Sequence, residues 1–319
     1  MFHFDGGLKL TAADLAIDFR RRQPRGFISH AHTDHMARHV LALCTPATAA
    51  LYHLRCGVRQ VMCLPYRQTI EWGGLRLTTF PAGHCLGSAM LLADDGETRL
   101  LYTGDFKLGP SATSETAELP QADVLVMEST FGDPKYRLPP REEVIGELIG
   151  IVRQTLERGQ TPVIEAYSLG KAQEVTRILT DAGIVVLQHY EVHRVSEVYV
   201  ELGMSLGNFL RLAAPLVPGK AVVVPPGRRH LPLPGVKRPV RIAVTGWAGD
   251  PSAKYRLGVD HAVPLSDHAD YDDLFAAVEQ VQPREVYCTH GPASFVDRLV
   301  DAGWKAFVLG RAARQTRLF

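Results

Sequence analysis

The feature that most constrains this chain is a dense run of potential metal ligands near its N-terminus. The run reads Ser29-His30-Ala31-His32-Thr33-Asp34-His35 and directly follows a short apolar stretch. Only 13 histidines occur in the 319 residues, so chance clustering explains the run poorly. Imidazoles and carboxylates suit zinc, manganese or iron, and this density exceeds what one four-coordinate ion needs. The run therefore predicts two adjacent divalent ions.

Further potential ligands stand where other apolar runs end. His84 lies in Ala82-Gly83-His84-Cys85, Asp105 follows Tyr102-Thr103-Gly104, and His290 follows Cys288-Thr289. Glycines beside them allow sharp turns at a crowded site. Taken singly, His84 or Asp105 is equally well explained as a turn or capping residue.

The pattern His-x-His-x-Asp-His, followed by separate His, Asp and His residues, resembles the metallo-β-lactamase superfamily. The resemblance implies an α/β fold, a four-layer αββα sandwich that carries a dinuclear site. It assigns His30, His32 and His84 to one ion, Asp34, His35 and His290 to the other, and Asp105 to the bridge between them. It also implies that Asp18 supports the ligand loop without binding metal, although a helix or turn cap is an alternative.

Later motifs resemble the β-CASP nucleases of this superfamily. They are Glu128-Ser129-Thr130-Phe131-Gly132, Ser168-Leu169-Gly170-Lys171-Ala172-Gln173-Glu174, Leu265-Ser266-Asp267-His268-Ala269-Asp270 and His290-Gly291. The resemblance implies a phosphodiesterase that uses a metal-bridging hydroxide, which is the chemistry that two neighbouring ions support. The motifs stand in family order and span nearly the whole chain.

The resemblance also assigns roles in catalysis. Asp34 would accept the proton of the nucleophile, and His268 would contact the scissile phosphate and protonate the leaving oxygen. Glu128 would hydrogen-bond His268 and keep it cationic. Ser168 and Lys171 would bind a substrate phosphate at a helix start. Alternatively, Ser168 is only a helix N-cap and Lys171 only a solvated lysine.

The pattern of apolar residues changes along the chain. Short strands and loops are expected in the first third, whereas helical spacing begins near Arg141 and is followed by alternating strands and helices, which predicts a small parallel α/β sheet. Between Pro215 and Pro239, prolines and the basic residues 228, 229, 237 and 238 predict loop. We expect a discontinuous metallo-β-lactamase domain at 1–133 and 258–319, with an inserted β-CASP domain at 134–257.

Composition excludes several classes of protein. A net charge of +1 gives no general attraction to polyanions, so affinity for nucleic acid must be local. The five cysteines form no C-x-x-C pair, which argues against a disulfide framework and fits a reducing cytoplasm. The N-terminus lacks an apolar signal segment and no stretch is apolar enough for a membrane span, so a cytoplasmic protein is expected.

Within the β-CASP group the chain is most similar to bacterial exonucleases associated with DNA ligase and a helicase. This favours single-stranded DNA or DNA ends in repair as substrate, with DNA ligase and helicase as partners, and zinc or manganese as cofactor. His290, by contrast, resembles RNA-processing members, so a β-CASP ribonuclease is the main alternative. Two alternatives are weaker. One is a lactonase-type or thioesterase-type hydrolase, in which Glu128 and His268 would be dispensable, and the other is a binding subunit without catalysis.

Overall fold

The computed structural model describes residues 1–4, 6–213, 218–227 and 239–310, and the chain divides into two compact units. Unit 1 comprises Met1–Pro110, Ser114–Pro134 and the segment from His268 onward, and unit 2 comprises Ser111–Thr113 and Lys135–Asp267. The second boundary therefore lies at residue 268, not at the 258 expected from the sequence. The difference arises because residues 261–263 form a strand of the unit 2 sheet.

The first sheet of unit 1 has the strand order β1-β2-β3-β4-β5-β6. Its strands are β1 Phe2–Phe4, β2 Leu8–Leu10, β3 Leu15–Ile17, β4 Arg25–Phe27, β5 Leu41–Cys44 and β6 Val61–Cys63. The pairs from β1 to β3 are antiparallel, and those from β3 to β6 are parallel. The ligand run follows β4 and so begins at an interior strand of this sheet.

The second sheet of unit 1 has the order β19-β18-β11-β10-β9-β8-β7. Its strands are β7 Thr69–Trp72, β8 Leu75–Pro81, β9 Ala89–Asp94, β10 Arg99–Tyr102, β11 Val124–Glu128, β18 Glu285–Thr289 and β19 Ala306–Val308. Strand β9 is antiparallel to both β8 and β10, and β11 and β18 continue parallel to β10. Strands β8, β10, β11 and β18 therefore all end at the same edge.

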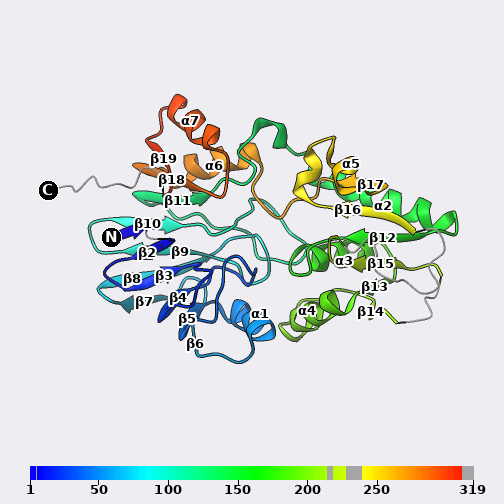
Figure 1. The fold of residues 1–319 in the computed structure, drawn as a ribbon, viewed down its shortest axis with the longest axis horizontal. Coiled ribbons are helices and arrows are strands. Elements are labelled where there is room, and N and C mark those ends of the chain that lie inside the picture. The colour runs from blue at the N-terminus through cyan, green and yellow to red at the C-terminus, as the bar shows by residue number, and fades with distance from the viewer. Residues whose placement is uncertain (5, 214–217, 228–238, 311–319) are drawn as a thin grey trace. The chain divides into compact units, whose positions relative to one another are not determined.

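Apolar side chains point alternately to the two faces of the second sheet, so one face packs against the first sheet and the other against helices. Leu100 and Tyr102 belong to a buried cluster shared with strands of the first sheet, whereas Leu101 between them faces a cluster shared with α6 and α7. Helices α6 Tyr271–Val281 and α7 Ala293–Asp301 lie over β18 and β11, and α1 Pro46–Cys56 lies beside β5 and β6 (Figure 1). The expected αββα sandwich is confirmed.

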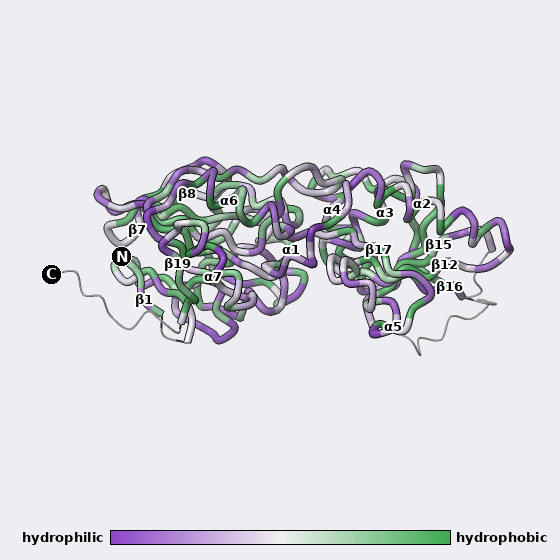
Figure 2. Tube along the Cα trace, turned by 90° about the horizontal axis from the view of Figure 1, so that it is seen from above, coloured by the Kyte–Doolittle hydropathy of each residue, from purple (hydrophilic) through white to green (hydrophobic). Residues whose placement is uncertain are grey.

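Unit 2 is built around a parallel sheet with the order β14-β13-β15-β12-β16-β17. Its strands are β12 Thr161–Glu165, β13 Val186–Gln188, β14 Phe209–Arg211, β15 Ala221–Val224, β16 Pro239–Val244 and β17 His261–Val263. Its helices are α2 Arg141–Glu157, α3 Lys171–Asp181, α4 Tyr190–Glu201 and α5 Ala253–Leu257, with short 3₁₀ turns η1 Pro134–Tyr136 and η2 Gly246–Gly249. Figure 2 shows β15 in hydrophobic green, and all of its residues are buried, as expected for a strand covered on both faces.

The change of pattern near Arg141 is confirmed, because α2 begins there and strands and helices alternate after it as far as α4. The first third contains the expected short strands and loops, and also α1, an 11-residue helix that the pattern did not predict. Much of the expected loop at 215–239, including basic residues 228, 229, 237 and 238, lies outside the described residues. No helix in the described part of the chain is long and apolar enough to cross a bilayer.

Candidate metal centre

The carboxyl edge of the second sheet gathers the separate ligands predicted from sequence. His84 follows β8, Asp105 follows β10, Glu128 ends β11 and His290 follows β18. Because these strands run in the same direction, their ends present side chains to one region. The loop after β4 meets this edge through a hydrogen bond from Ala89 N to Ser29 O of 2.9 Å.

One group of ligand atoms comes from His30, His32, His84 and Asp105, and all of them lie within 4.8 Å of one another. His32 Nδ1 is 3.0 Å from His30 Nε2 and 3.1 Å from His84 Nε2. A hydrogen on His32 Nδ1 can be donated to only one of the two other nitrogens. A cation bound among the three nitrogens, by contrast, is attracted to all of them. The donor set therefore fits a metal ion.

A second group, His35, Asp105 and His290, shares Asp105 with the first. Asp105 Oδ2 lies 3.2 Å from His35 Nε2 and 3.6 Å from His30 Nε2. The rings of His35 and His290 are 5.5 Å apart between centroids. His290 adopts a left-handed backbone with φ of 58°, which is uncommon outside glycine and recurs at functional sites. Asp105 is therefore the residue that the two groups share.

Two glycines allow these ligands to crowd together. A Cβ on Gly104, whose φ is 58°, would lie 2.8 Å from the Ser29 side chain, and a Cβ on Gly291 would lie 1.9 Å from Ser129 O. Contacts this short require the backbone to move. Larger residues at either position would displace Asp105 or His290.

Asp18 holds the ligand loop in place. Among the described residues its carboxylate accepts hydrogen bonds from Ser29 N (2.8 Å), Ser29 Oγ (2.5 Å), His35 Nδ1 (2.9 Å) and Tyr102 Oη (2.8 Å). Because the Ser29 hydroxyl donates to Asp18, its oxygen is left to accept from His30 Nδ1 at 3.0 Å. These bonds direct the Nε2 atoms of both His30 and His35 toward Asp105, and an unprotonated Nε2 is the form that binds metal.

Glu128 and His268 form a hydrogen-bonded pair beside the first group. His268 Nδ1 lies 2.8 Å and 3.0 Å from the two Glu128 carboxylate oxygens. Glu128 is buried and also accepts from Phe106 N at 2.9 Å and from Thr130 Oγ1 at 2.5 Å. The His268 ring lies 4.6 Å from the His84 ring between centroids. The pair is thus fixed in orientation and adjacent to the metal ligands.

Comparisons with known proteins identify the family. Residues 255–309 match a family model described as a Zn-dependent metallo-hydrolase RNA specificity domain. A probable DNA ligase from Opitutus terrae is 38% identical over 315 residues, which are 96% of this chain and 31% of that protein. The chain belongs to the β-CASP group of metallo-β-lactamase-fold proteins.

Two further relatives of this β-CASP protein carry names of RNA-cleaving proteins. An endoribonuclease of Yarrowia lipolytica, YSH1, is 32% identical over 130 residues, which are 40% of this chain and 16% of the relative. An RNase J-like protein of Methanocaldococcus jannaschii is 30% identical over 181 residues, covering 48% of this chain and 42% of the relative. The chain spans less than half the length of each of these relatives.

The electrostatics of the β-CASP metal centre favour a bound cation. Burial, with the rings of His35, His84 and His32 adding to it, holds the pKa of His30 well below its usual value. His30 is therefore a neutral ligand.

The neighbouring His35 is affected in the opposite direction. Burial alone would lower its pKa, but Asp105 and Asp18 raise it well above the usual value. Burial likewise opposes charge on Asp105, yet the His35 ring keeps the pKa of this carboxyl well below its usual range. The flanking carboxylates thus favour positive charge at His35, and a metal ion competes with a proton for its Nε2.

Asp34 lies at the margin of the site. Its side chain is 54% exposed and its Oδ2 is 3.9 Å from both His35 Nε2 and the Arg20 guanidinium, while Arg20 Nε donates to Asp34 O at 3.1 Å. The candidate ligand groups of the described residues do not include it. Metal binding by Asp34 therefore stays a prediction.

Lys171 occupies an environment that differs from the expected one. Its side chain is 1% exposed, and its Nζ lies 2.7 Å from Glu174 Oε2 and 3.9 Å from Asp267 Oδ1 within unit 2. Glu174 also pairs with Arg141 at 2.7 Å. The alternative of a solvated lysine is therefore wrong, because the Lys171 ammonium is buried between carboxylates. Its contact with a substrate phosphate stays a prediction.

Ser168 also differs from its expected local role, because the N-cap of α3 is Gly170. Gly170 N donates to Gln173 Oε1 at 2.8 Å, and Gln173 Nε2 donates to Ser168 O at 3.1 Å. Ser168 is half-buried, and its contact with substrate stays a prediction.

Several residues that support the site were not predicted from the sequence. Ser29 and Tyr102 both donate to Asp18, and Thr130 donates to Glu128. All three lie in or beside segments that the motifs had singled out, so proximity in sequence was the available signal. Their hydrogen-bond partners became apparent only from the folded chain.

Replacing Asp18 with Asn should weaken metal binding by about 10- to 100-fold, the usual cost of losing a partner of a ligating histidine. The NH2 group of the new amide would face one of the N–H or O–H groups that now donate to the carboxylate. Asp14→Asn is the matched control, because Asp14 has a similar φ of 45° against 49° at Asp18 but is exposed. Zinc titration of both variants with a competing chelator measures the effect. Equal affinities would show that Asp18 does not orient the ligands.

Proposed function

We propose that this β-CASP protein is a metal-dependent nuclease that hydrolyses phosphodiester bonds. The observation that carries the proposal is the position of the Glu128–His268 pair next to two ligand groups that share Asp105. A site that only held a structural metal would have no use for an oriented imidazole at its border.

We further propose that two divalent ions, zinc or manganese, occupy the ligand groups. His30, His32 and His84 would hold one, His35 and His290 the other, Asp105 both, and Asp34 would complete the set by a small movement of its exposed side chain. When bound, such ions neutralise the charge of a phosphate and lower the pKa of a water molecule.

The chain's own groups supply the proton transfers. In the proposed step a water oxygen adds to phosphorus, the bond from phosphorus to the leaving oxygen breaks, and the water proton passes to the Asp34 carboxylate. His268, held through Nδ1 by Glu128, gives a proton from Nε2 to the leaving oxygen. General acid and base catalysis of this kind contributes about 10²- to 10⁴-fold each.

The proposed substrate is single-stranded DNA or a DNA end, cleaved by an exonuclease that acts in repair together with DNA ligase and a helicase. The support comes from the Opitutus terrae relative named a probable DNA ligase, which contains a region similar to 96% of this chain. RNA is the alternative substrate, favoured by the description of the matching family model and by the relatives named as ribonucleases.

Cleavage of end-labelled single-stranded DNA and RNA of the same sequence tests the function. Metal-stripped protein supplied with zinc or manganese should degrade DNA. His32→Ala and Asp105→Ala should abolish the activity, because each removes a ligand atom of the first group. Cleavage of RNA alone would favour the alternative. No cleavage of either strand, with rapid hydrolysis of a lactone or thioester, would contradict the proposal.

Glu128→Gln should lower the rate of cleavage by about 10²- to 10⁴-fold while the metal content stays unchanged. The neutral amide keeps the shape of the side chain but no longer holds His268 by a carboxylate. Single-turnover rates and metal analysis measure the two effects. Glu71→Gln, an exposed strand position, is the control. A Glu128→Gln variant with full activity would assign the pair a structural role only.

A further inference from the structure

Unit 2 contains a pocket of about 500 Å³ at the carboxyl ends of its parallel strands. Glu165 ends β12, Val244 ends β16 and Pro226 lies shortly after β15, and all three line the pocket. In parallel α/β sheets this edge is where ligands bind, because the connecting loops leave a crevice there. The volume lies within the range of small-molecule sites.

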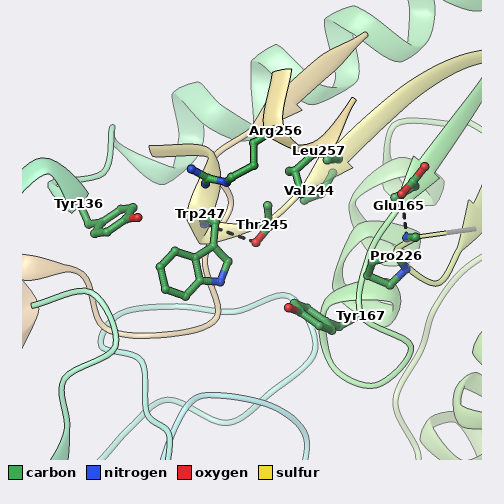
Figure 3. A pocket seen from close by; sticks show the side chains of 11 residues that line it. Tyr136, Glu165, Tyr167, Pro226, Val244, Thr245, Trp247, Arg256 and Leu257 are labelled. Atoms are coloured by element: carbon green, nitrogen blue, oxygen red, sulfur yellow. Dashed lines mark hydrogen bonds between the residues drawn. The ribbon is translucent and has the colours of Figure 1, made fainter. Parts of the chain in front are cut away.

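Aromatic rings form much of the exposed wall of this pocket. Tyr167 is 52% exposed and Trp247 is 39% exposed, and Figure 3 shows both rings reaching into the same space. Tyr136 packs edge-on against Trp247, with ring centroids 5.5 Å apart. Trp247 N also donates to Thr245 Oγ1 at 3.4 Å, within the turn that begins η2. The rings are thus supported by neighbours and present apolar faces to solvent.

The two charged residues that line the pocket differ in exposure, because Glu165 is buried whereas Arg256 is exposed and pairs with Asp250 on one side. Glu165 is buried, accepts from Arg241 at 2.9 Å and from Gly227 N at 3.1 Å, and is thereby neutralised. Arg256 is half-exposed on α5, and its guanidinium lies 3.4 Å from Asp250 Oδ2 at one side. Arg256 and Trp247 both line the pocket (Figure 3). Apolar ring faces next to a guanidinium are the combination that binds a nucleotide, through base stacking and a phosphate contact.

We infer that this pocket binds one nucleotide of a single-stranded nucleic acid, with the base stacked on Trp247 and Tyr167 and a phosphate at Arg256. The inference rests on the proposed nuclease function and assigns a substrate-binding site to unit 2 that lies outside the metal centre. Stacking tolerates any base, so the pocket would hold a strand without selecting its sequence.

Binding of a fluorescein-labelled ten-nucleotide oligothymidylate to the full-length chain tests the inference. The protein is held in chelator, so that no cleavage occurs, and binding is followed by fluorescence anisotropy. Trp247→Ala and Tyr167→Ala should each weaken binding by roughly 5- to 150-fold, the effect of removing one stacking contact. Trp247→Phe should restore most of the affinity, since a phenyl ring also stacks. Tyr255→Ala, which removes an 82% exposed ring of the neighbouring helix, should bind like the parent chain.

The two proposals fail in different ways. If the parent chain cleaves DNA or RNA with metal but both alanine variants bind like Tyr255→Ala, the pocket does not bind the strand and the nuclease proposal stands. If the parent chain cleaves neither, the proposed function fails whatever the variants bind. Tighter capture of a peptide than of the oligonucleotide by the parent chain, lost in Trp247→Ala, would overturn the nucleotide assignment.

Discussion

Hydrogen bonds to the Asp18 carboxylate determine which ring nitrogens this chain offers to a metal. Ser29 and His35 donate to it directly, and His30 is oriented one step further through the Ser29 hydroxyl. Asp18 itself adopts a left-handed backbone with φ of 49°, a conformation that places its side chain beneath the ligand loop. Because buried polar groups are costly to leave unpaired, this network admits few alternative arrangements of the rings.

The fold brings the remaining ligands to the network by strand direction. Side chains at the ends of β8, β10, β11 and β18 meet at one edge, although the sequence separates the first from the last by about two hundred residues. The core clusters on the two faces of this sheet hold the strands in register. Glu128 is the buried last residue of β11, and its carboxylate is hydrogen-bonded to both Phe106 N and His268 Nδ1. The strand thereby fixes the position of His268.

The sequence indicated the candidate ligands because they are dense, chemically distinctive and placed at the ends of apolar runs. The fold brings all of them except Asp34 into the two groups that share Asp105, and their binding of metal stays a prediction. The sequence also located the start of α2, whose periodic apolar pattern runs over a helix of 17 residues. Strands such as β1 and β14 have only three residues, too few to show a period, so the pattern did not fix their bounds. The burial of Lys171 was not predictable for a different reason. Its partner Asp267 lies almost a hundred positions away, and only the folded unit brings the two charges together.

The metal centre is the claim from which the proposed chemistry follows, and counting the ions bound per chain tests it most directly. Purified protein is loaded with excess zinc or manganese, desalted and analysed for metal by mass spectrometry. We expect two ions per chain in the parent protein, and a marked loss of both when the shared residue Asp105 is replaced by Ala. A single ion in the saturated parent chain, or two ions retained by Asp105→Ala, would contradict a centre bridged by Asp105.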